Sequence, residues 1–433
     1  MLTRRATAAP FSKRRYGGTL LQTPHINKLA REGVRFTDGY ATAAVCGPSR
    51  SGIITGTYQQ RFGMQANPDG NRYTVPAMHK VMPEALSAAG YKTGMFGKWN
   101  MPQGKGAEEL FTEANGVMDW VGDFWPNADG RFNGVDDGPS ATHMDWLPHW
   151  GPERPGDEYL TDKLTRHTVD FIEKYKDVPF FIYLAYNAPH NPWQAKLSDR
   201  NETIAQLWNE PKAIYAAMVK AVDDGVGRVL DRLYKDRIDS RTLVAFVSDN
   251  GPDSGHRPQP GWKAEWPNPV VMGDEGALSG GKNQLAEGGI RVPFIMRWPG
   301  TIPRGEVYTE PVMSFDFYTT FLAAAGADIP SGTDLSGANL LPFVRGEATS
   351  RRPHDLLFWK SMRHFAVRWG DWKLSTVYAR GSEGGVALYN LRDDIGERHD
   401  QSTMRPDIKR NLLDEYRTWC ARMPVSASGI SNC

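Results

Sequence analysis

The sequence has few cysteines, no long apolar run and almost no net charge. Three cysteines among 433 residues are too few for a disulfide-stabilised scaffold. No run of about 18 apolar residues is present, so we expect no membrane span. A net charge of +1 argues against a general nucleic-acid-binding protein, whose surface would carry an excess of basic residues.

The first fifteen residues, MLTRRATAAPFSKRR, lack acidic residues and lack the apolar segment of a signal peptide. We expect residues 1–15 to form a basic tail outside the folded domain. The chain as printed therefore shows no export signal.

The three cysteines fall into two groups. Cys420 and Cys433 lie near the C-terminus, where two surface thiols are favoured over a single bridge. Cys46 stands apart from both, so it is available for chemistry.

Apolar runs bounded by turn residues alternate with helical patterns along most of the chain. Strands are expected at 91–99, 179–189, 242–252 and 292–300, and helices at 23–33, 75–90, 157–176, 212–237 and 315–326. This alternation predicts an α/β domain over residues 16–350, with a large, mostly parallel sheet flanked by helices. Residues 351–433 change to short alternating strands and a last helix near 405–421, which predicts a smaller α+β subdomain.

Two long stretches, 101–157 and 253–280, fit neither the strand nor the helix pattern. Loops this long in a compact domain are usually functional or disordered. The tryptophans in these two stretches favour functional loops over disordered ones.

Polar residues follow several expected strands, at the sheet edge where open α/β folds bind ligands. Asp249 and Asn250 carry oxygens suited to a hard cation, although Asp-Asn-Gly is also a common turn. His190 lies between two prolines, where packing alone would explain a histidine. Neither lysine requires a functional explanation on its own. Lys98 could be a solvated surface lysine, and Lys282 could belong to a flexible glycine-rich loop.

Cys46 precedes Gly-Pro-Ser-Arg at the expected start of another helix. Free N–H groups and the helix dipole attract anions to such a terminus. Pro48 suits a first helical turn, and Arg50 follows one turn on. With two lysines and a histidine nearby, the pattern indicates a site for a tetrahedral oxyanion.

The segment CGPSRSGIITG (46–56) resembles the Cys-x-Pro-Ser-Arg-x-x-x-x-Thr-Gly motif of the type I sulfatases, which belong to the alkaline phosphatase superfamily. The likeness runs from about Tyr16 to the C-terminal region. Further blocks follow in the same order: TPHINKLAREGVRFTDGYA, TGMFGKW, APHNP, VSDNG, GGKNQLAEGGIRVP and LYNLRDD. The resemblance implies an alkaline-phosphatase-like α/β fold and sulfatase activity, so that residues 16–350 would be the catalytic domain.

The resemblance also implies that Cys46 is oxidised to formylglycine by a formylglycine-generating or sulfatase-maturating enzyme. The hydrate of formylglycine would attack the sulfur of a sulfate ester. Arg50 would then orient the hydrate, and Lys98 and Lys282 would hold sulfate oxygens. His190 would protonate the leaving oxygen or lie beside it. Asp249 and Asn250 would bind a calcium ion, or magnesium in its place.

Two features depart from the family pattern. Asn100 stands where the family usually has histidine, so we expect altered sulfate contacts. The family's first strand, which ends in two aspartate metal ligands, has no counterpart in the matched sequence. Either the true start lies upstream, with an export signal for the periplasm or for secretion, or the gene is a remnant. The first explanation is favoured because every other block is intact.

The tryptophan-rich loops favour a sulfated oligosaccharide over another sulfated small molecule, because aromatic faces stack on sugar rings. Trp125 and Trp262 are the substrate-binding candidates. A phosphatase or phosphodiesterase of the same superfamily is one alternative, and Cys46 argues against it. The other alternative is an impaired enzyme or a non-catalytic binder of sulfated glycans, because the metal site is incomplete.

Overall fold

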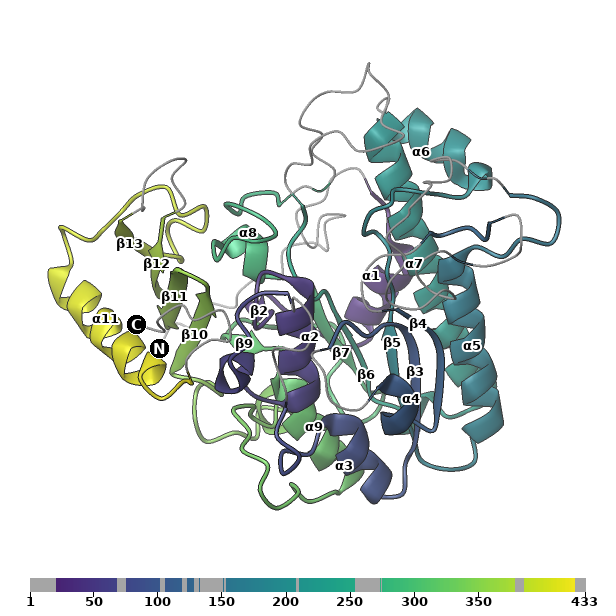
Figure 1. Ribbon diagram of the computed structural model, residues 1–433, viewed down its shortest axis with the longest axis horizontal. Helices are drawn as coiled ribbons and strands as arrows, with labels where there is room; N and C mark the ends of the chain where they lie inside the picture. Colours follow the sequence, from purple (N-terminus) through teal and green to yellow (C-terminus); the bar gives the residue numbers. More distant parts are fainter. Residues whose placement is uncertain are drawn as a thin grey trace, which may run out of the picture.

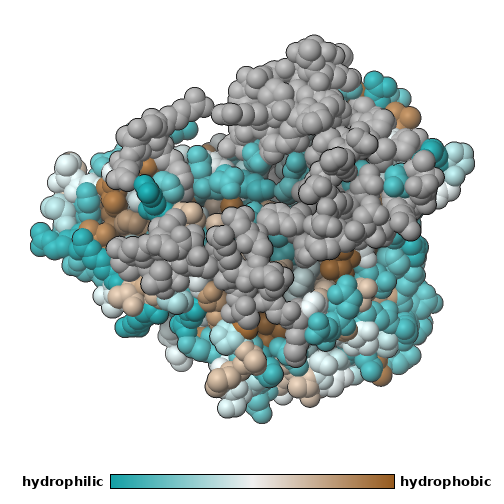
Figure 2. Space-filling model, in the orientation of Figure 1, coloured by the Kyte–Doolittle hydropathy of each residue, from teal (hydrophilic) through white to brown (hydrophobic). Residues whose placement is uncertain are grey.

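The computed structural model describes residues 21–67, 75–101, 106–118, 123–127, 132, 151, 153–207, 210–253, 273, 275–377 and 385–424. Among these residues, no helix combines the length and the apolar character needed to cross a bilayer. On the face shown in Figure 2, hydrophilic residues predominate over the described surface, and apolar residues form only small patches.

The described residues of the main body form three sheets (Figure 1). The first has the order β4-β3-β5 and is parallel: β4 (Glu113–Met118), β3 (Lys92–Lys98) and β5 (Phe180–Ala185). The second is mixed and has the order β6-β7-β1-β8: β6 (Val244–Val247), β7 (Phe294–Arg297), β1 (Val34–Phe36) and β8 (Glu306–Tyr308). A short parallel pair joins β2 (Gly39–Tyr40) to β9 (Val312–Met313).

Helices pack on both faces of the two larger sheets. One layer contains α1 (Pro24–Arg31), α5 (Leu160–Tyr175) and α7 (Glu210–Lys235). The other layer contains α2 (Cys46–Thr55), α3 (Met82–Ala88) and α9 (Asp316–Ala325) (Figure 1). The α/β fold class is confirmed. Shorter elements connect these layers: η1 (Gln59–Phe62), α4 (Ala107–Leu110), η2 (Leu197–Asp199), α6 (Arg200–Leu207), η3 (Asp239–Arg241), α8 (Glu287–Ile290) and α10 (Leu341–Val344).

Two helices show where the sequence pattern predicted the structure correctly and where it did not. The apolar stripe of α5 buries Leu160, Leu164, Phe171 and Ile172, as its periodicity predicted. The helix expected over 75–90 begins only at Met82, so its first part was wrong. Proline at position 83 lies in the first turn, where its missing N–H would have no helical partner anyway.

An antiparallel sheet of four strands follows the main body. It contains β10 (Leu356–Ser361), β11 (His364–Trp369), β12 (Trp372–Thr376) and β13 (Val386–Asn390), in that order. Helix α11 (Pro406–Cys420) covers it, with the Tyr416 and Phe365 rings 4.0 Å apart at their centroids. Cys420 is fully buried and disulfide-bonded, so the expectation of a surface thiol was wrong for this residue.

Buried charges join this C-terminal sheet to the main body. Lys373 on β12 contacts Glu287 at 2.8 Å and Glu397 at 2.9 Å. Asp38 pairs with Arg368 at 2.6 Å and with Arg291 at 2.9 Å. We call these six residues the interface cluster. It contains three carboxylates and three cations, so its charges balance.

Candidate functional site

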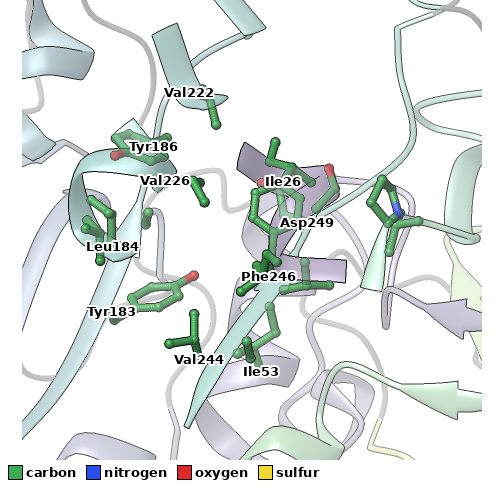
Figure 3. Close-up of a pocket in the computed structure, with 18 of the residues that line it drawn as sticks. Ile26, Ile53, Tyr183, Leu184, Tyr186, Val222, Val226, Val244, Phe246 and Asp249 are labelled. Carbon is green, nitrogen blue, oxygen red and sulfur yellow. The ribbon is translucent and has the colours of Figure 1, made fainter. Parts of the chain in front are cut away.

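Residues from three strand ends meet at one edge of the fold. Lys98 ends β3, His190 follows β5, and Asp249 and Asn250 follow β6. Together with Cys46, Arg50 and Lys282 they line one cavity of about 1230 Å³. Asp249 is among the lining residues labelled in Figure 3. The structure therefore brings together seven residues that the sequence analysis had selected from five separate segments.

Cys46 is the first residue of α2, and its thiol is free. Only 3% of the residue is exposed. The backbone N–H of Gly47 donates to the Asn67 side chain at 3.0 Å, which fixes the entry of the chain into the helix. The thiol thus lies at a positively polarised helix terminus, where an anion is favoured.

Arg50 connects helix α2 to residues at the ends of two strands. Its guanidinium donates to the Asp249 carboxylate at 2.7–2.8 Å and to the Lys98 carbonyl at 2.8 Å. Burial lowers the pKa of Arg50, but the Asp249 carboxylate outweighs that effect and leaves the pKa raised. Arg50 therefore stays charged and ties α2 to the ends of β3 and β6.

Lys282 reaches the site from the loop before α8 and contacts His190. The Lys282 ammonium donates to Nε2 of His190 at 3.1 Å, and Nδ1 of His190 lies 2.7 Å from the Asn191 carbonyl. Burial lowers the pKa of His190 to about 3, assisted by the positive charges of Lys98 and Lys282. His190 is therefore neutral at pH 7, with its proton on Nδ1 and a lone pair on Nε2.

Lys98 is almost completely buried, with 3% exposed. Burial lowers its pKa, and Arg50 and Lys282 act in the same direction, while Cys46 and Asp249 oppose them. Burial would raise the pKa of Asp249, but Arg50, Lys98 and Lys282 hold it below its usual value. Three cations therefore surround the one carboxylate that they share among the described residues. We call Arg50, Lys98, Lys282 and Asp249 the site cluster.

Asp249 and Asn250 offer oxygens to a hard cation. The Asn250 amide donates to the Gly251 carbonyl at 2.8 Å, which leaves its buried Oδ1 with no hydrogen-bond partner. Gly251 packs so closely on the 288–289 segment that an added Cβ would lie 1.8 Å from the Gly288 carbonyl oxygen. The unpartnered oxygen and the Asp249 carboxylate fit part of the set of 6–8 oxygens typical of calcium.

Two of the three predicted substrate-site residues, Asn100 and Trp125, do not line this cavity. Asn100 is buried beyond β3 in the left-handed region (φ 49°), with Oδ1 unpartnered. Trp125 is 3% exposed, and its ring packs 5.2 Å from that of Tyr159 in the core beside α5. Core packing therefore accounts for Trp125, and a sugar-stacking role does not fit its burial. Trp262 lies outside the described residues.

Two cavity residues were missed by the sequence analysis. Tyr183 lies on β5 and interacts with Arg50 and Asp249; burial raises its pKa, with Asp249 acting in the same direction and Arg50 opposing. Asn187 follows β5 and is buried with both side-chain polar atoms unpartnered. A polar residue just beyond an apolar strand was a usable signal for Asn187. Nothing in an apolar strand distinguishes Tyr183 from a core tyrosine.

A second carboxylate group lies apart from the site. Oxygen and nitrogen atoms of His25, Asp223 and Asp224 lie within 4.8 Å of one another. Asp223 accepts the backbone N–H groups of His25 and Ile26 at 3.1 and 2.8 Å. Its role in holding the start of α1 explains the grouping.

Family models match most of the chain. The model described as Sulfatase matches residues 9–327, and N-sulphoglucosamine sulphohydrolase, C-terminal, matches residues 281–415. An uncharacterized sulfatase, YdeN of Escherichia coli (strain K12), is 32% identical over 348 residues, which cover 78% of this chain and 59% of that protein. The N-acetylgalactosamine-6-sulfatase of Sus scrofa is 29% identical, with 83% of this chain and 67% of that protein covered. The chain thus spans about three fifths to two thirds of these relatives.

Solved structures share the fold. The crystal structure of Ps i-CgsB in complex with k-i-k-neocarrahexaose superposes with a TM-score of 0.76 and 30% identity, covering 95% of this chain and 90% of that one. A phosphonate monoester hydrolase of Agrobacterium radiobacter has a TM-score of 0.66 at 18% identity, covers 94% and 92% of the two chains, and shows the fold alone.

Proposed function

Because the chain belongs to the sulfatase family, we propose that it hydrolyses sulfate monoesters of a carbohydrate at the site around Cys46. The observation that carries the proposal is the convergence of Cys46, at a helix N-terminus, with three cations that act together on the Asp249 carboxylate. Such a site favours an anionic ligand. A sulfate ester and its transition state place negative charge on several oxygens, which matches this arrangement.

We assign the residues their roles from their positions. Cys46 would be oxidised to formylglycine by a maturating enzyme, and the hydrated aldehyde supplies a nucleophile for sulfur. Arg50 would hold that group toward the substrate, since Asp249 and the Lys98 carbonyl fix its guanidinium. Lys98 and Lys282 would bind sulfate oxygens.

His190 would act through its neutral imidazole. Its Nε2 accepts from Lys282, so it holds the ammonium toward the centre of the site. Since Nε2 carries no proton of its own, His190 would take one from the Lys282 ammonium before giving it to the leaving oxygen.

Asp249 and Asn250 would hold a divalent cation, with calcium proposed first. Such an ion polarises sulfate oxygens and lowers the pKa of a bound hydroxyl. The two described donors make up only part of its coordination shell, so further oxygens must come from elsewhere in the protein, the substrate or water.

A sulfated oligosaccharide is the proposed substrate class. Support comes from relatives whose names specify a sulfated amino sugar and from the structure of Ps i-CgsB with a neocarrahexaose. We further propose that the protein acts in the periplasm or after secretion, where such glycans are encountered.

The proposal is tested by producing the chain together with a formylglycine-generating enzyme and calcium. Mass spectrometry of the peptide containing residue 46 reports the oxidation. Ion chromatography then measures sulfate released from sulfated galactan and glycosaminoglycan oligosaccharides. We expect formylglycine and sulfate release, both of which disappear in Cys46→Ala.

Lys80→Met removes a half-exposed surface lysine and serves as the matched control, with activity unchanged. If glycans bind without any sulfate release and residue 46 stays cysteine despite the maturating enzyme, the protein is a non-catalytic sulfated-glycan binder. Hydrolysis of phosphate diesters to monoesters in preference to sulfate release would favour the phosphodiesterase alternative.

A further inference from the structure

The turn that carries Lys282 is bonded through its backbone to both sides of the site. The Lys282 N–H donates to the Pro252 carbonyl at 2.8 Å, close to the end of β6. The Asn283 N–H donates to the Ala44 carbonyl at 2.9 Å, just before Cys46. The placement of this turn therefore decides where the Lys282 ammonium lies relative to Cys46.

The Lys282 turn and helix α8 pack as one unit. The Gly288 N–H donates to the Ser279 carbonyl at 2.7 Å. A Cβ added to Gly289 would lie 1.9 Å from the Gln284 carbonyl oxygen and 2.4 Å from that of Gly281. The backbones of α8 and the turn are therefore in direct contact. Because such packing leaves no free space between them, a displacement of α8 would displace the turn as well.

The first residue of α8 is held by the C-terminal subdomain, beside whose sheet α8 lies (Figure 1). The Glu287 N–H donates to the Glu397 carboxylate at 2.6 Å, and the Glu287 carboxylate accepts from the Lys373 ammonium at 2.8 Å. Lys373 also contacts Glu397 at 2.9 Å. These three side chains are at most 4% exposed, so water does not compete for their contacts. Lys373 and Glu397 thus help to fix where α8 begins.

The loop after β13 also approaches the segment that precedes the turn. A Cβ added to Gly396 would lie 3.1 Å from the Ala277 carbonyl oxygen, so the two backbones are close together. Ile395 lines the site cavity together with Leu278 and Lys282. The C-terminal subdomain therefore reaches the chain on both sides of the turn, before it and at α8.

The interface cluster acts on the site through position more than through charge. Its carboxylates and cations balance, so the attraction and repulsion that they exert on a distant anion largely cancel. What the cluster transmits is geometry. Lys373 and Glu397 hold α8, and α8 holds the turn. The turn in its place keeps the Lys282 ammonium 3.1 Å from Nε2 of His190.

We propose that Lys373 and Glu397 are positioning residues for Lys282. By fixing α8 from the C-terminal subdomain, they keep the Lys282 ammonium within reach of an oxyanion beside Cys46. The inference deepens the proposed function and rests on it for the role of Lys282 as a sulfate ligand. The placement of the turn does not depend on that role and is measured separately.

The first measurement is a double-mutant cycle on the full chain, with inorganic sulfate as the probe. Calorimetric titration compares the wild type, Lys282→Met, Lys373→Met and the double variant, at a temperature where unfolding curves show each of them folded. Lys282→Met should weaken sulfate binding about 10–100-fold, because it removes a charge-assisted hydrogen bond. Lys373→Met should weaken it about tenfold in the wild-type background, but less than about twofold in the Lys282→Met background, since its effect passes through Lys282.

Lys360→Met is the matched control for this cycle. Lys360 is a buried lysine of the same C-terminal sheet, but its ammonium donates to the Met362 carbonyl at 2.7 Å and not to α8. The variant removes one positive charge, as Lys373→Met does, and should keep the sulfate affinity of the wild type. A fall equal to that of Lys373→Met would assign the effect to lost charge or lost stability and would overturn the positioning role.

The second measurement is amide hydrogen exchange, which needs no sulfate. In Lys373→Met, residues 279–290 should exchange about threefold faster or more, while the amides of β3 keep their rates. A milder pair of variants serves if Lys373→Met does not fold. Gly396→Val crowds the Ala277 carbonyl, whereas a Cβ at Gly385 would meet no atom within 4 Å. Gly396→Val should speed exchange in the same segment and weaken sulfate binding, and Gly385→Val should do neither.

The outcomes separate this inference from the proposed function. If Lys373→Met weakens sulfate binding equally in both backgrounds, Lys373 does not act through Lys282 and the positioning role is wrong. Unchanged exchange of residues 279–290 in both Lys373→Met and Gly396→Val would overturn it as well. If Lys282→Met leaves sulfate affinity unchanged, the proposed function loses Lys282 as a sulfate ligand, while exchange at the turn still decides whether the C-terminal subdomain holds it.

Discussion

The interface cluster and the site cluster are both built from buried charges, but their charges balance differently. In the interface cluster, three carboxylates contact three cations at 2.6–3.2 Å. In the site cluster, three cations act on a single described carboxylate. The balanced cluster holds two parts of the fold together, whereas we propose that a negatively charged ligand completes the unbalanced one. The comparison teaches that the sum of buried charges, more than their number, separates a structural cluster from a binding site.

Removing a cation from the interface cluster should have the largest effect on the free energy of unfolding. In Lys373→Met, Glu287 and Glu397 lose the cation between them. Removing one partner of a buried ion pair costs about 3–5 kcal/mol of unfolding free energy. Burial would raise the pKa of Glu287, but Lys373, Arg291 and Arg368 lower it to about 2, so this carboxylate is held charged.

Denaturant unfolding measures the loss, with Lys360→Met as the control. Lys360 is also buried, but its ammonium donates only to the Met362 carbonyl at 2.7 Å among the contacts described. The control should lose about 1 kcal/mol. Equal losses in both variants would contradict the importance of the balanced cluster.

Removing a cation from the site cluster should weaken sulfate binding and leave the stability of the fold unchanged. In Lys98→Met, sulfate affinity should fall about 10–100-fold, because a charge-assisted hydrogen bond contributes about 1.5–3 kcal/mol. Stability should not fall, since burial and neighbouring cations already oppose the Lys98 charge. Calorimetric titration with sulfate and denaturant unfolding measure the two quantities. A destabilised variant with unchanged sulfate affinity would make Lys98 a structural residue.

The sequence indicated which residues would lie together better than it predicted the sheets. Seven of the site residues lie within short, ordered blocks with distinctive chemistry, so local patterns sufficed. Strands β1 and β8 are only three residues long and were missed, because so short a strand leaves no periodic signal. Trp125 shows that the burial of a side chain is hard to predict from sequence. Composition suggested a substrate-binding tryptophan, but its packing against Tyr159 depends on the tertiary structure. Tyr183 was missed because only the fold places it beside Arg50.

The pH dependence of stability should reveal that burial, assisted by Lys98 and Lys282, keeps His190 neutral. His190 has a folded pKa of about 3, below the unfolded value of about 6.5, so the unfolded state binds the extra proton. Its stabilising contribution is complete above about pH 6.5 and is lost as the pH falls toward 3. His190→Gln should therefore reduce the destabilisation between pH 7 and pH 5.5 by about 1–2 kcal/mol.

Unfolding curves at several pH values test this expectation. His399→Gln, on an exposed side chain, is the control and should retain the wild-type slope. If His190→Gln and the wild type lose stability in parallel, His190 is not held neutral by its surroundings.

Substitution of the proposed cation ligand Asn250 should have the smallest effect on stability. Asn250→Ala removes the unpartnered Oδ1 and its bond to Gly251, so stability in metal-free buffer should change by about 1 kcal/mol or less. The stabilisation gained on adding calcium should disappear in this variant. Thermal unfolding with and without calcium measures both. Equal calcium stabilisation of the variant and the wild type would place the ion elsewhere.

The most direct measurement of the central claim is a diffraction experiment on crystals soaked with selenate, an analogue of sulfate with a strong anomalous signal. The account expects one strong anomalous peak beside Cys46, within hydrogen-bonding distance of Lys98 and Lys282, and none at the interface cluster. A peak that avoids the site cluster, or its absence at saturating selenate, would contradict the claim that the unbalanced charges form an oxyanion site.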